Sequence, residues 1–600
     1  QPLPPLQGFD VTPVQVAAEP ETGEPPTVSY TVVLEGFDGT GLADEFKDLS
    51  ALQDGKGKAE NAAMVQARAR EDEALAVRLL RSEGYYDASA VSTLDTPAAG
   101  EPIRAVVSVT TGKQYKLGEI VVRAGAVVPP GLIRDNLPLE TGDPIIAERV
   151  EAAEANVSLE LPQNGYPFAK LGMRDIALDG ATATGDYTLP VDTGPRGSFG
   201  GITTSGDLAF DAEHIEVMRR YKRGELYDSR KVDDLRKALV ATSLFSSVTV
   251  EPRATGRPGP DGTEQVDLHV EQDAGPARTL AGEAGYGTGQ GFRAEGSWTH
   301  RNLFPPEGAL IISGVGGTQE QALQAAFRRS NAGKRDRTVQ ASIGASHQNY
   351  RSYEAFTARL AGSISRVSTP IFQKRWTYSY GFELLASNET TLNETTGETK
   401  RLTYFIGALP GQLGYDRSDD LLNATKGFRV TLRASPEASL QGDVSPYLRA
   451  SLDISGYYPA TDSIVIAGRT RVGTITGAAR DDVAPSRRIY AGGGGSVRGF
   501  GYQQLGPKDA SNDPIGGRSV VEFALEARYR FGNFGIVPFV DAGQVYESSM
   551  PKLSDIRLGA GIGGRFYTNF GPFRADIAMP LNRRPGESKF TVYIGIGQAF

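Results

Sequence analysis

The sequence predicts an α+β region of three tandem modules, followed by an all-β, 16-stranded transmembrane β-barrel. Two observations support this prediction. Residues 28–275 contain a threefold internal repeat, and residues 276–600 contain long runs in which apolar and charged side chains alternate. A chain of 600 residues is also too long for one hydrophobic core, so several domains are expected.

The composition excludes several functional classes. Cysteine is absent, which removes disulfides, thiolate catalysis and thiolate metal sites. The formal net charge of −9 provides no overall positive field for a nucleic acid, so no nucleic-acid partner is expected. The 72 glycines, 24 tyrosines and 25 phenylalanines are typical of a glycine-rich, aromatic β-protein.

Residues 1–27 are expected to form an N-terminal tail. The chain opens with the polar, proline-rich segment QPLPPLQGFDV, and we expect Gln1 to lie at or near the mature N-terminus. No segment approaches the roughly 18 consecutive apolar residues of a spanning helix. A closed barrel needs no such segment, because pairing between its strands satisfies every backbone group in lipid.

Two sets of glycines mark the repeat in the N-terminal half. Gly84 is answered by Gly165, and Gly112, Gly194 and Gly275 recur at nearly the same spacing. A period of about 80 residues is too long for a solenoid repeat, so each copy should be a small domain with its own core. The predicted domains are residues 28–114, 115–196 and 197–275, followed by a barrel over 276–600.

Each copy of the repeat has the pattern strand, helix, helix, strand, strand. In the first copy, YTVVLEG is the predicted opening strand, GLADEFKDL the first helix and residues 61–81 the second helix. Strands are expected at 88–94 and 103–109. In the third copy, HIEVMRRY and SRKVDDLRKALVA are the predicted helices.

Alternation over about 8–12 residues characterises the C-terminal half. In 520–531, apolar residues alternate with Glu and Arg, and 427–435, 448–454 and 573–579 show the same pattern. A soluble sandwich also alternates, but its strands are usually about 5–6 residues long. The longer runs match tilted strands that cross a bilayer, with the charged face toward a water-filled lumen. Sixteen candidate strands fit between 279 and 600, and the even number allows closure.

Two motifs stand out in this half. The tetrapeptide Val497-Arg498-Gly499-Phe500 lies in a long segment, roughly 473–516, between two strand candidates. The chain ends in KFTVYIGIGQAF, in which Tyr593 lies between apolar residues of one face, including Ile594 and Ile596, and Phe600 is the terminal residue. We interpret this ending as the C-terminal signal of a bacterial β-barrel, an amphipathic last strand that ends in an aromatic residue. An ordinary exposed edge strand is the less favoured explanation, because such edges promote aggregation.

Enzyme chemistry finds no support in the sequence. Residues 559–564 match GxGxxG, but a strand-like segment follows, so small residues on a tight barrel strand explain the match better than a nucleotide site. No GxSxG, HExxH or P-loop motif occurs. We therefore expect no enzyme, no catalytic residue and no cofactor. We also expect no metal site, because the four histidines lack the spacing of metal ligands: His214, His269, His300 and His347.

The whole arrangement resembles the TamA family within the BamA/TamA superfamily of outer-membrane assembly proteins. The resemblance covers nearly the whole chain beyond the tail, and it identifies the three modules with POTRA domains. Their number favours the TamA family. BamA-like chains typically carry five such domains, and two-partner-secretion transporters carry two and a plug helix.

The resemblance also implies the positions of site residues. In this superfamily a VRGF or VRGY motif tips the loop between strands eleven and twelve, and that loop folds back into the lumen. A lumenal Arg498 then requires a carboxylate partner. Residues 539–543 resemble the family's partner motif, so Asp541 is the first candidate, and Glu522, on the charged face of the intervening strand, is the second. Gly499 would permit a tight loop tip.

The function implied by the resemblance is non-enzymatic. Such proteins reside in the bacterial outer membrane with their POTRA domains in the periplasm, and they help to insert unfolded autotransporters and other β-barrel clients. A TamB-like inner-membrane partner, contact with outer-membrane lipid and a monomeric barrel are expected. The family's lateral gate implies a weak seam between the last strand and the first strand, Thr279–Thr288.

Three alternative functions remain open. A two-partner-secretion exporter would carry an N-terminal plug helix, which Gln1–Pro26 does not resemble. A lipid-transport partner of TamB is the second alternative. The third is a ligand-binding or structural barrel with POTRA-like spacers.

Overall fold

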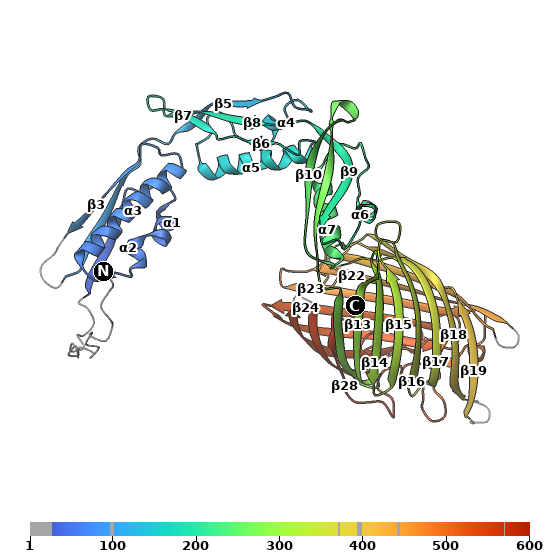
Figure 1. The fold of residues 1–600 in the computed structure, drawn as a ribbon. Helices are drawn as coiled ribbons and strands as arrows, with labels where there is room; N and C mark the ends of the chain where they lie inside the picture. The colour runs from blue at the N-terminus through green and yellow to red at the C-terminus, as the bar shows by residue number, and fades with distance from the viewer. Residues whose placement is uncertain (1–26, 96–100, 370–371, 393–398, 441–443, 569–570) are drawn as a thin grey trace, which may run out of the picture. The chain divides into compact units, whose positions relative to one another are not determined.

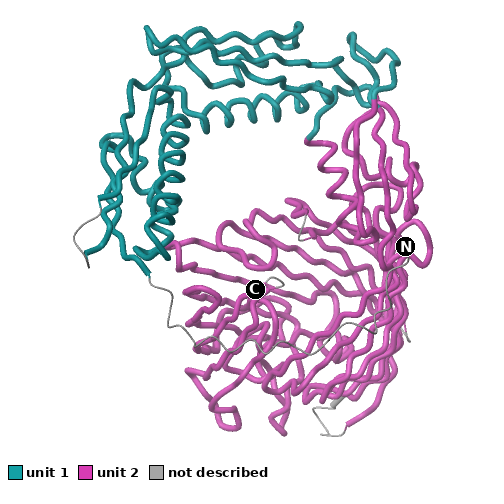
Figure 2. Tube along the Cα trace, turned by 60° about the vertical axis from the view of Figure 1, so that its left-hand side comes forward, with its two compact units in different colours: residues 1–199, 224–229, 254–266 teal, residues 200–223, 230–253, 267–600 magenta. Residues whose placement is uncertain are grey.

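The computed structural model of the chain describes residues 27–95, 101–369, 372–392, 399–440, 444–568 and 571–600 (Figure 1). They form two compact units (Figure 2): one contains the described residues up to 199 with 224–229 and 254–266, and the other contains 200–223, 230–253 and 267–600. Residues 1–26, nearly all of the expected N-terminal tail, lie outside the described residues.

The first module is an α+β domain with a four-stranded sheet of order β2-β1-β4-β3. The opening strand β1 runs parallel to β4, and β3 pairs with β4 in antiparallel fashion. Helix α3 begins where the side chain of Asn61 accepts a hydrogen bond from the amide of Met64. The elements are β1 (Val28–Glu35), α1 (Ala43–Leu49), α2 (Ala51–Asp54), β2 (Lys58–Ala59), α3 (Ala62–Ser82), β3 (Ser89–Asp95) and β4 (Ile103–Thr110).

The segment between the predicted helices of the first module is not a simple link. It contains the short helix α2 and the two-residue strand β2, which pairs with the edge of β1. The carboxylate of the buried Asp72, from α3, accepts hydrogen bonds from Ser50 Oγ at 2.5 Å and from the amide of Ala51 at 2.8 Å. Asp72 thereby satisfies the otherwise unpaired start of α2.

The second and third modules are also α+β domains, each with two helices and a small sheet. In the second, β5 runs parallel to β8, and β6 and β7 both pair with β8. The third has a three-stranded sheet of order β10-β11-β9. The elements are β5 (Lys116–Ala124), α4 (Leu132–Asp135), α5 (Ala147–Gln163), β6 (Lys170–Leu171), β7 (Asp175–Asp179) and β8 (Thr184–Asp192), then β9 (Gly197–Gly206), α6 (Ala212–Met218), α7 (Ser229–Ala241), β10 (Phe245–Pro258) and β11 (Glu264–Ala274).

The remaining strands close into an antiparallel barrel (Figure 1). They are β12 (Arg278–Gly287), β13 (Gly291–Phe304), β14 (Gly308–Gly317), β15 (Glu320–Arg329), β16 (Thr338–Asn349), β17 (Glu354–Arg366), β18 (Trp376–Leu392), β19 (Thr399–Ala408), β20 (Gly411–Asp416), β21 (Gly427–Ser439), β22 (Ser445–Pro459), β23 (Ile464–Thr476), β24 (Ser519–Phe531), β25 (Phe534–Tyr546), β26 (Arg557–Thr568), β27 (Gly571–Pro580) and β28 (Thr591–Ile596).

The barrel has 16 strands, as the sequence predicts. The 17 labels arise because β19 and β20 are two halves of one strand, and each half pairs with β18 on one side and β21 on the other. The interruption falls at Leu409-Pro410. Proline has no backbone N–H and cannot donate to the ladder, which explains the break.

The outer face of the barrel is apolar and exposed, whereas the inner face carries the charges. Leu360 lies opposite Leu384, and Leu432 lies opposite Leu452, on neighbouring strands. A continuous exposed apolar face of this extent is typical of contact with lipid. Other exposed outward residues are Leu323, Ile343, Leu525, Ile562 and Ile577. Within the described residues, no helix is both long and apolar enough to cross a membrane.

Candidate functional site in the barrel lumen and seam

The longest connection in the barrel joins β23 to β24 and contains the VRGF motif. It runs over residues 477–518, between the eleventh and twelfth strands. Val497 is fully buried and packs in an apolar cluster with Leu505, Val520 and Val545. Because β24 and β25 supply two of these side chains, the loop tip is anchored to the inner wall.

Arg498 is almost completely buried, with 1% of its surface exposed. Its Nε donates to Oδ2 of Asp541 at 2.7 Å and its Nη2 donates to Oδ1 at 2.9 Å, a bidentate pair. The backbone amide of Arg498 donates to the same carboxylate at 2.9 Å. The guanidinium carbon also lies 3.5 Å from the centre of the Phe539 ring.

Two further carboxylates complete the surroundings of this guanidinium. Nη1 lies 2.7 Å from Oε1 of Glu526 and 3.3 Å from Oδ2 of Asp576. Burial opposes the charge of Arg498, but Asp541, Glu526 and Asp576 outweigh that effect and raise the pKa of the guanidinium above its usual value. The arginine is therefore charged at every relevant pH.

Two more arginines balance the cluster. Arg565 Nη1 donates to Asp576 at 2.5 Å, and Arg528 Nε donates to Glu526 at 2.9 Å. All six side chains are buried, and their formal charges cancel. Buried charges are tolerated only when they are paired, so the network couples the loop to four strands, β24 to β27. We call these residues the Arg498 network: Arg498, Asp541, Glu526, Asp576, Arg565 and Arg528.

The structure brings Arg498 to Asp541 but not to Glu522. Glu522 is buried on β24, where it accepts a hydrogen bond from Ser496, and its other oxygen lies 3.9 Å from Arg471 Nη1. Side chains on one face of a strand recur every second residue, so Glu522 and Glu526 share the lumenal face. The tip of the loop lies at the level of Glu526 on β24, further along the strand than Glu522, so Arg498 contacts Glu526.

Gly499 and Gly559 allow the loop tip to rest directly on the wall. Gly499 has φ +100°, and a Cβ there would lie 2.9 Å from the carbonyl oxygen of Met579. A Cβ on Gly559 would lie 1.9 Å from the carbonyl oxygen of Arg498. The GxGxxG segment thus lies on strand β26, where its first glycine admits the loop backbone. The ring of Phe500 is buried, and its carbonyl accepts a hydrogen bond from Tyr593 Oη at 2.6 Å.

The seam between the first and last strands is short. β12 pairs with β13 over ten positions but with β28 over only two, Tyr286 opposite Ile594 and Gly287 opposite Tyr593. Next to these pairs, the amide of Thr288 donates to the carbonyl of Val592 at 3.1 Å. In the described part of the chain, residues 278–285 of β12 therefore have no strand partner on the β28 side.

The chain leaves the barrel wall after Ile596. Gly597 has φ +93°, which turns the backbone out of the strand. Phe600 then packs beside Tyr457 and Ala467, and Arg528 Nη2 donates to its carbonyl oxygen at 3.2 Å. The sequence places Phe600 on the last strand, but the structure places it inside, apart from the outward-facing Ile594 and Ile596.

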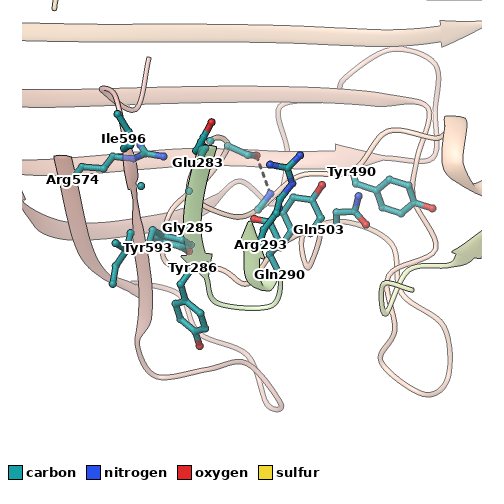
Figure 3. A pocket seen from close by; sticks show the side chains of 18 of the residues that line it. Glu283, Gly285, Tyr286, Gln290, Arg293, Tyr490, Gln503, Arg574, Tyr593 and Ile596 are labelled. Atoms are coloured by element: carbon teal, nitrogen blue, oxygen red, sulfur yellow. Dashed lines mark hydrogen bonds between the residues drawn. The ribbon is translucent and has the colours of Figure 1, made fainter. Parts of the chain in front are cut away.

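A cavity of about 470 Å³ lies on the inner side of this seam (Figure 3). Glu283, Tyr286, Tyr593 and Ile594 line it from the two seam strands, and Arg574 lines it from β27. The seam thus combines a free strand edge with an inward-facing polar cavity.

Sequence reasoning missed four residues of the Arg498 network: Glu526, Asp576, Arg565 and Arg528. Alternation marks each of them as lumenal, but it does not show which lumenal charges lie at the height of the loop tip. The histidines lie in α6, β11, β13 and β16, and the described residues contain no group of three or more His, Cys, Asp or Glu that could hold a metal ion. The arrangement offers charge pairing, a fixed loop and an open strand edge.

Comparison with known proteins agrees with this architecture. BamA, the outer membrane protein assembly factor of Neorickettsia risticii, is 23% identical over 551 residues, which cover 88% of this chain and 72% of that protein. The BamA of Neisseria meningitidis is 21% identical over 585 residues, covering 87% of this chain and 71% of that protein.

A solved structure and a family model add to these relatives. The crystal structure of Haemophilus ducreyi BamA lacking POTRA domains 1–3 is similar in fold, with a TM-score of 0.66 and 18% identity, covering 81% of this chain and 100% of that chain. The Omp85 superfamily domain matches residues 286–600. Because this match extends over more than half of the chain and includes the loop and the last strand, the chain belongs to the Omp85 superfamily.

Proposed function

We propose that this protein inserts and folds β-barrel proteins, including autotransporters, in the bacterial outer membrane. The single observation that carries the proposal is the seam, at which eight residues of β12 lack a partner in an otherwise paired barrel. The relatives of the chain are outer membrane protein assembly factors, which supports the same function.

The free edge of β12 is suited to β-augmentation. Its unpaired N–H and C=O groups can pair with an extended client strand, which then occupies the position that β28 leaves open. Pairing replaces hydrogen bonds to water at little net cost, and transfer of the client's apolar face into lipid provides the free energy. The process needs no nucleotide, cofactor or catalytic residue.

The Arg498 network has a supporting role in this mechanism. It fixes the loop against β24–β27, so the wall on the β28 side of the seam stays rigid while the seam exchanges partners. Tyr593 connects β28 to the loop, because its hydroxyl donates a hydrogen bond to the carbonyl of Phe500. We expect changes in this network to affect assembly through the position of β28.

The N-terminal modules supply the second half of the proposal. Three POTRA-like domains precede the barrel, a number that favours the TamA type, and we propose that they lie in the periplasm and bind a TamB-like inner-membrane partner. Strand β3 of the first module and β7 of the second pair on one side only in the described residues, so each offers an edge to an extended segment.

Client insertion by purified protein tests the proposal. An unfolded autotransporter barrel is added to liposomes that contain the wild type, the Arg498→Ala variant or no protein, and the protease-resistant, heat-modifiable product is measured over time. We expect the wild type to accelerate insertion and Arg498→Ala to lose most of this acceleration. Equal rates in wild-type and empty liposomes, with the wild-type barrel folded, would exclude the assembly function.

A further inference from the structure

The residues that line the cavity at the seam carry more positive than negative charge. Arg293, Arg471 and Arg574 line it, and Glu283 is the one lining carboxylate among the described residues. Figure 3 shows Arg574 and Arg293 on either side of the strand segment that carries Glu283, Gly285 and Tyr286. Glu283 is exposed, so its negative charge is screened by water.

Arg574 is the least satisfied of the three arginines. Its Nε and Nη1 are buried and have no hydrogen-bond partner within the described chain. Asp576, on the same face of β27, is already engaged by Arg565 and Arg498. Gly595 leaves the space in front of the guanidinium open, since a Cβ there would lie 4.0 Å from Arg574 Nε. Two buried guanidinium nitrogens without acceptors are costly, so this position favours an anionic ligand.

The guanidinium of Arg471 also forms only weak ion pairs with its neighbouring carboxylates. Its Nε lies 3.8 Å from Asp453 and its Nη1 lies 3.9 Å from Glu522, both beyond hydrogen-bond distance. Arg293 differs, because Glu295 and Glu320 accept from it at 2.9 and 3.2 Å. Two guanidinium groups therefore retain donors for a ligand.

The four-glycine run before the VRGF motif forms the wall of the same cavity. Gly492, Gly494, Gly495 and Ser496 line it. The amides of Gly494 and Gly495 have no hydrogen-bond partner among the described residues. Gly494 also lies against Tyr593, since a Cβ there would be 3.2 Å from that ring. Backbone amides of a glycine-rich turn beside arginines are typical of sites for phosphate oxygens.

We propose that this cavity binds a phosphate group carried by a membrane lipid. A phosphate offers several acceptor oxygens and up to two negative charges, which match the donors of Arg574, Arg471 and the glycine turn. The cavity also borders the gap in the barrel wall, where Ile594 and Ile596 are 53% and 39% exposed on the outer side. Acyl chains can extend along these side chains while the headgroup lies inside.

Binding to the purified, full-length protein in a non-ionic detergent tests this site without any client, so its result is independent of the assembly function. The probes are dihexanoyl phosphatidic acid, inorganic phosphate and dihexanoylglycerol, titrated by calorimetry. We expect one phosphatidic acid per barrel, bound at least about tenfold more tightly than either of the other probes. Equal binding of inorganic phosphate would overturn the lipid assignment, and no binding of phosphatidic acid would overturn the site.

Variants locate the site. Arg574→Gln should weaken phosphatidic acid binding by about tenfold or more, because it removes a charged donor from a buried site. Arg471→Gln is the second variant and should weaken binding in the same direction, so the test stands even if Arg574→Gln prevents folding. Arg359→Gln is the matched control, since Arg359 is paired with Glu383 elsewhere on the barrel wall. Wild-type affinity in both cavity variants, with folded barrels, would contradict the proposal.

Discussion

At the scale of single residues, buried charge pairs hold the loop in the lumen, beside the apolar cluster around Val497. Arg498 is surrounded by three carboxylates, and removing it leaves Asp541, Glu526 and Asp576 with one fewer positive charge. We expect Arg498→Ala to destabilise the barrel by about 3–5 kcal/mol, the usual cost of leaving a buried charge unpaired. Arg498→Lys should restore only part of this, because lysine cannot pair bidentately. The temperature at which the compact form disappears on unboiled gels measures both effects.

Substitutions of Asp541 and Glu522 test which of these two carboxylates stabilises the loop. Asp541 accepts three hydrogen bonds from Arg498, whereas Glu522 accepts one from Ser496. Asp541→Asn should therefore lower the unfolding temperature clearly more than Glu522→Gln does. Equal losses from the two substitutions would mean that general lumenal charge, rather than the Arg498 pair, stabilises the loop.

Asp72 predicts a pH dependence in the first module. Burial raises the pKa of its carboxyl above the usual value, and hydrogen bonds from Ser50, Ala51 and Leu52 offset this only in part. A carboxyl with a raised pKa in the folded state stabilises the fold least when it is ionised. The contribution of Asp72 to the stability of the module should therefore be fully present below about pH 3.8 and be lost as the pH rises through the raised pKa.

Hydrogen exchange of the α2 and α3 amides, corrected for the intrinsic pH effect, measures this dependence in the full chain. Asp72→Asn removes the ionisation and should flatten the profile between pH 4 and pH 7. An unchanged profile in this variant would show that another group controls the pH response of the module.

Part of this site can be predicted from the sequence alone. The VRGF motif and the segment around Asp541 identify two residues that the structure places 2.7 Å apart. The contribution of Glu526 and Asp576 was not accessible, because strand alternation assigns a face but no height along the barrel. Height depends on the stagger between neighbouring strands, which only the closed structure defines.

At the scale of elements, the last strand decides the state of the seam. If the register of Tyr286 with Ile594 continued, Gly282 would lie opposite Gln598 and Leu280 opposite Phe600. The turn at Gly597 prevents this extension. The chain therefore directs its last four residues to the interior, where Gln598 accepts a hydrogen bond from Arg565 at 3.1 Å and so connects the tail to the Arg498 network.

Gly597→Val tests this relation. A β-branched residue disfavours the left-handed backbone by about 1–2 kcal/mol, and no atom lies within 4 Å of the position that a Cβ would occupy, so the effect is conformational. The variant should extend β28, so that β28 pairs with more residues of β12 across the seam. Cysteines at Gly282 and Gln598 should then cross-link several times faster than in the parent, which has no other cysteine. Equal cross-linking rates would contradict control of the seam by Gly597.

Other elements show where sequence patterns succeed and where they fail. Long alternating runs such as 521–531 predict spanning strands, because the outward apolar face and the inward charged face both leave a signal. The split between β19 and β20 and the added α2 and β2 carry no such periodicity. The last strand is shorter than its alternation indicates because a single glycine conformation, invisible to the pattern, ends it.

At the scale of the whole molecule, three α+β modules precede a barrel whose strands pair extensively everywhere except at the short seam between β12 and β28. The threefold repeat and the alternating half predicted an α+β region followed by a closed barrel, and the structure has both. Membership of the Omp85 superfamily follows from the barrel half, whereas the client class and the TamB-like partner are proposals that rest on the modules and the seam.

The most direct test of the account is whether the seam must open for insertion. The variant Tyr286→Cys/Ile594→Cys is locked by oxidation at the two positions that face each other across the seam. The control is Leu452→Cys/Val472→Cys, an opposed outward-facing pair on the fully paired strands β22 and β23. We predict that oxidation abolishes accelerated client insertion in the seam variant, that reduction restores it, and that the control keeps its rate in both states. Full acceleration with the seam locked would contradict the central claim.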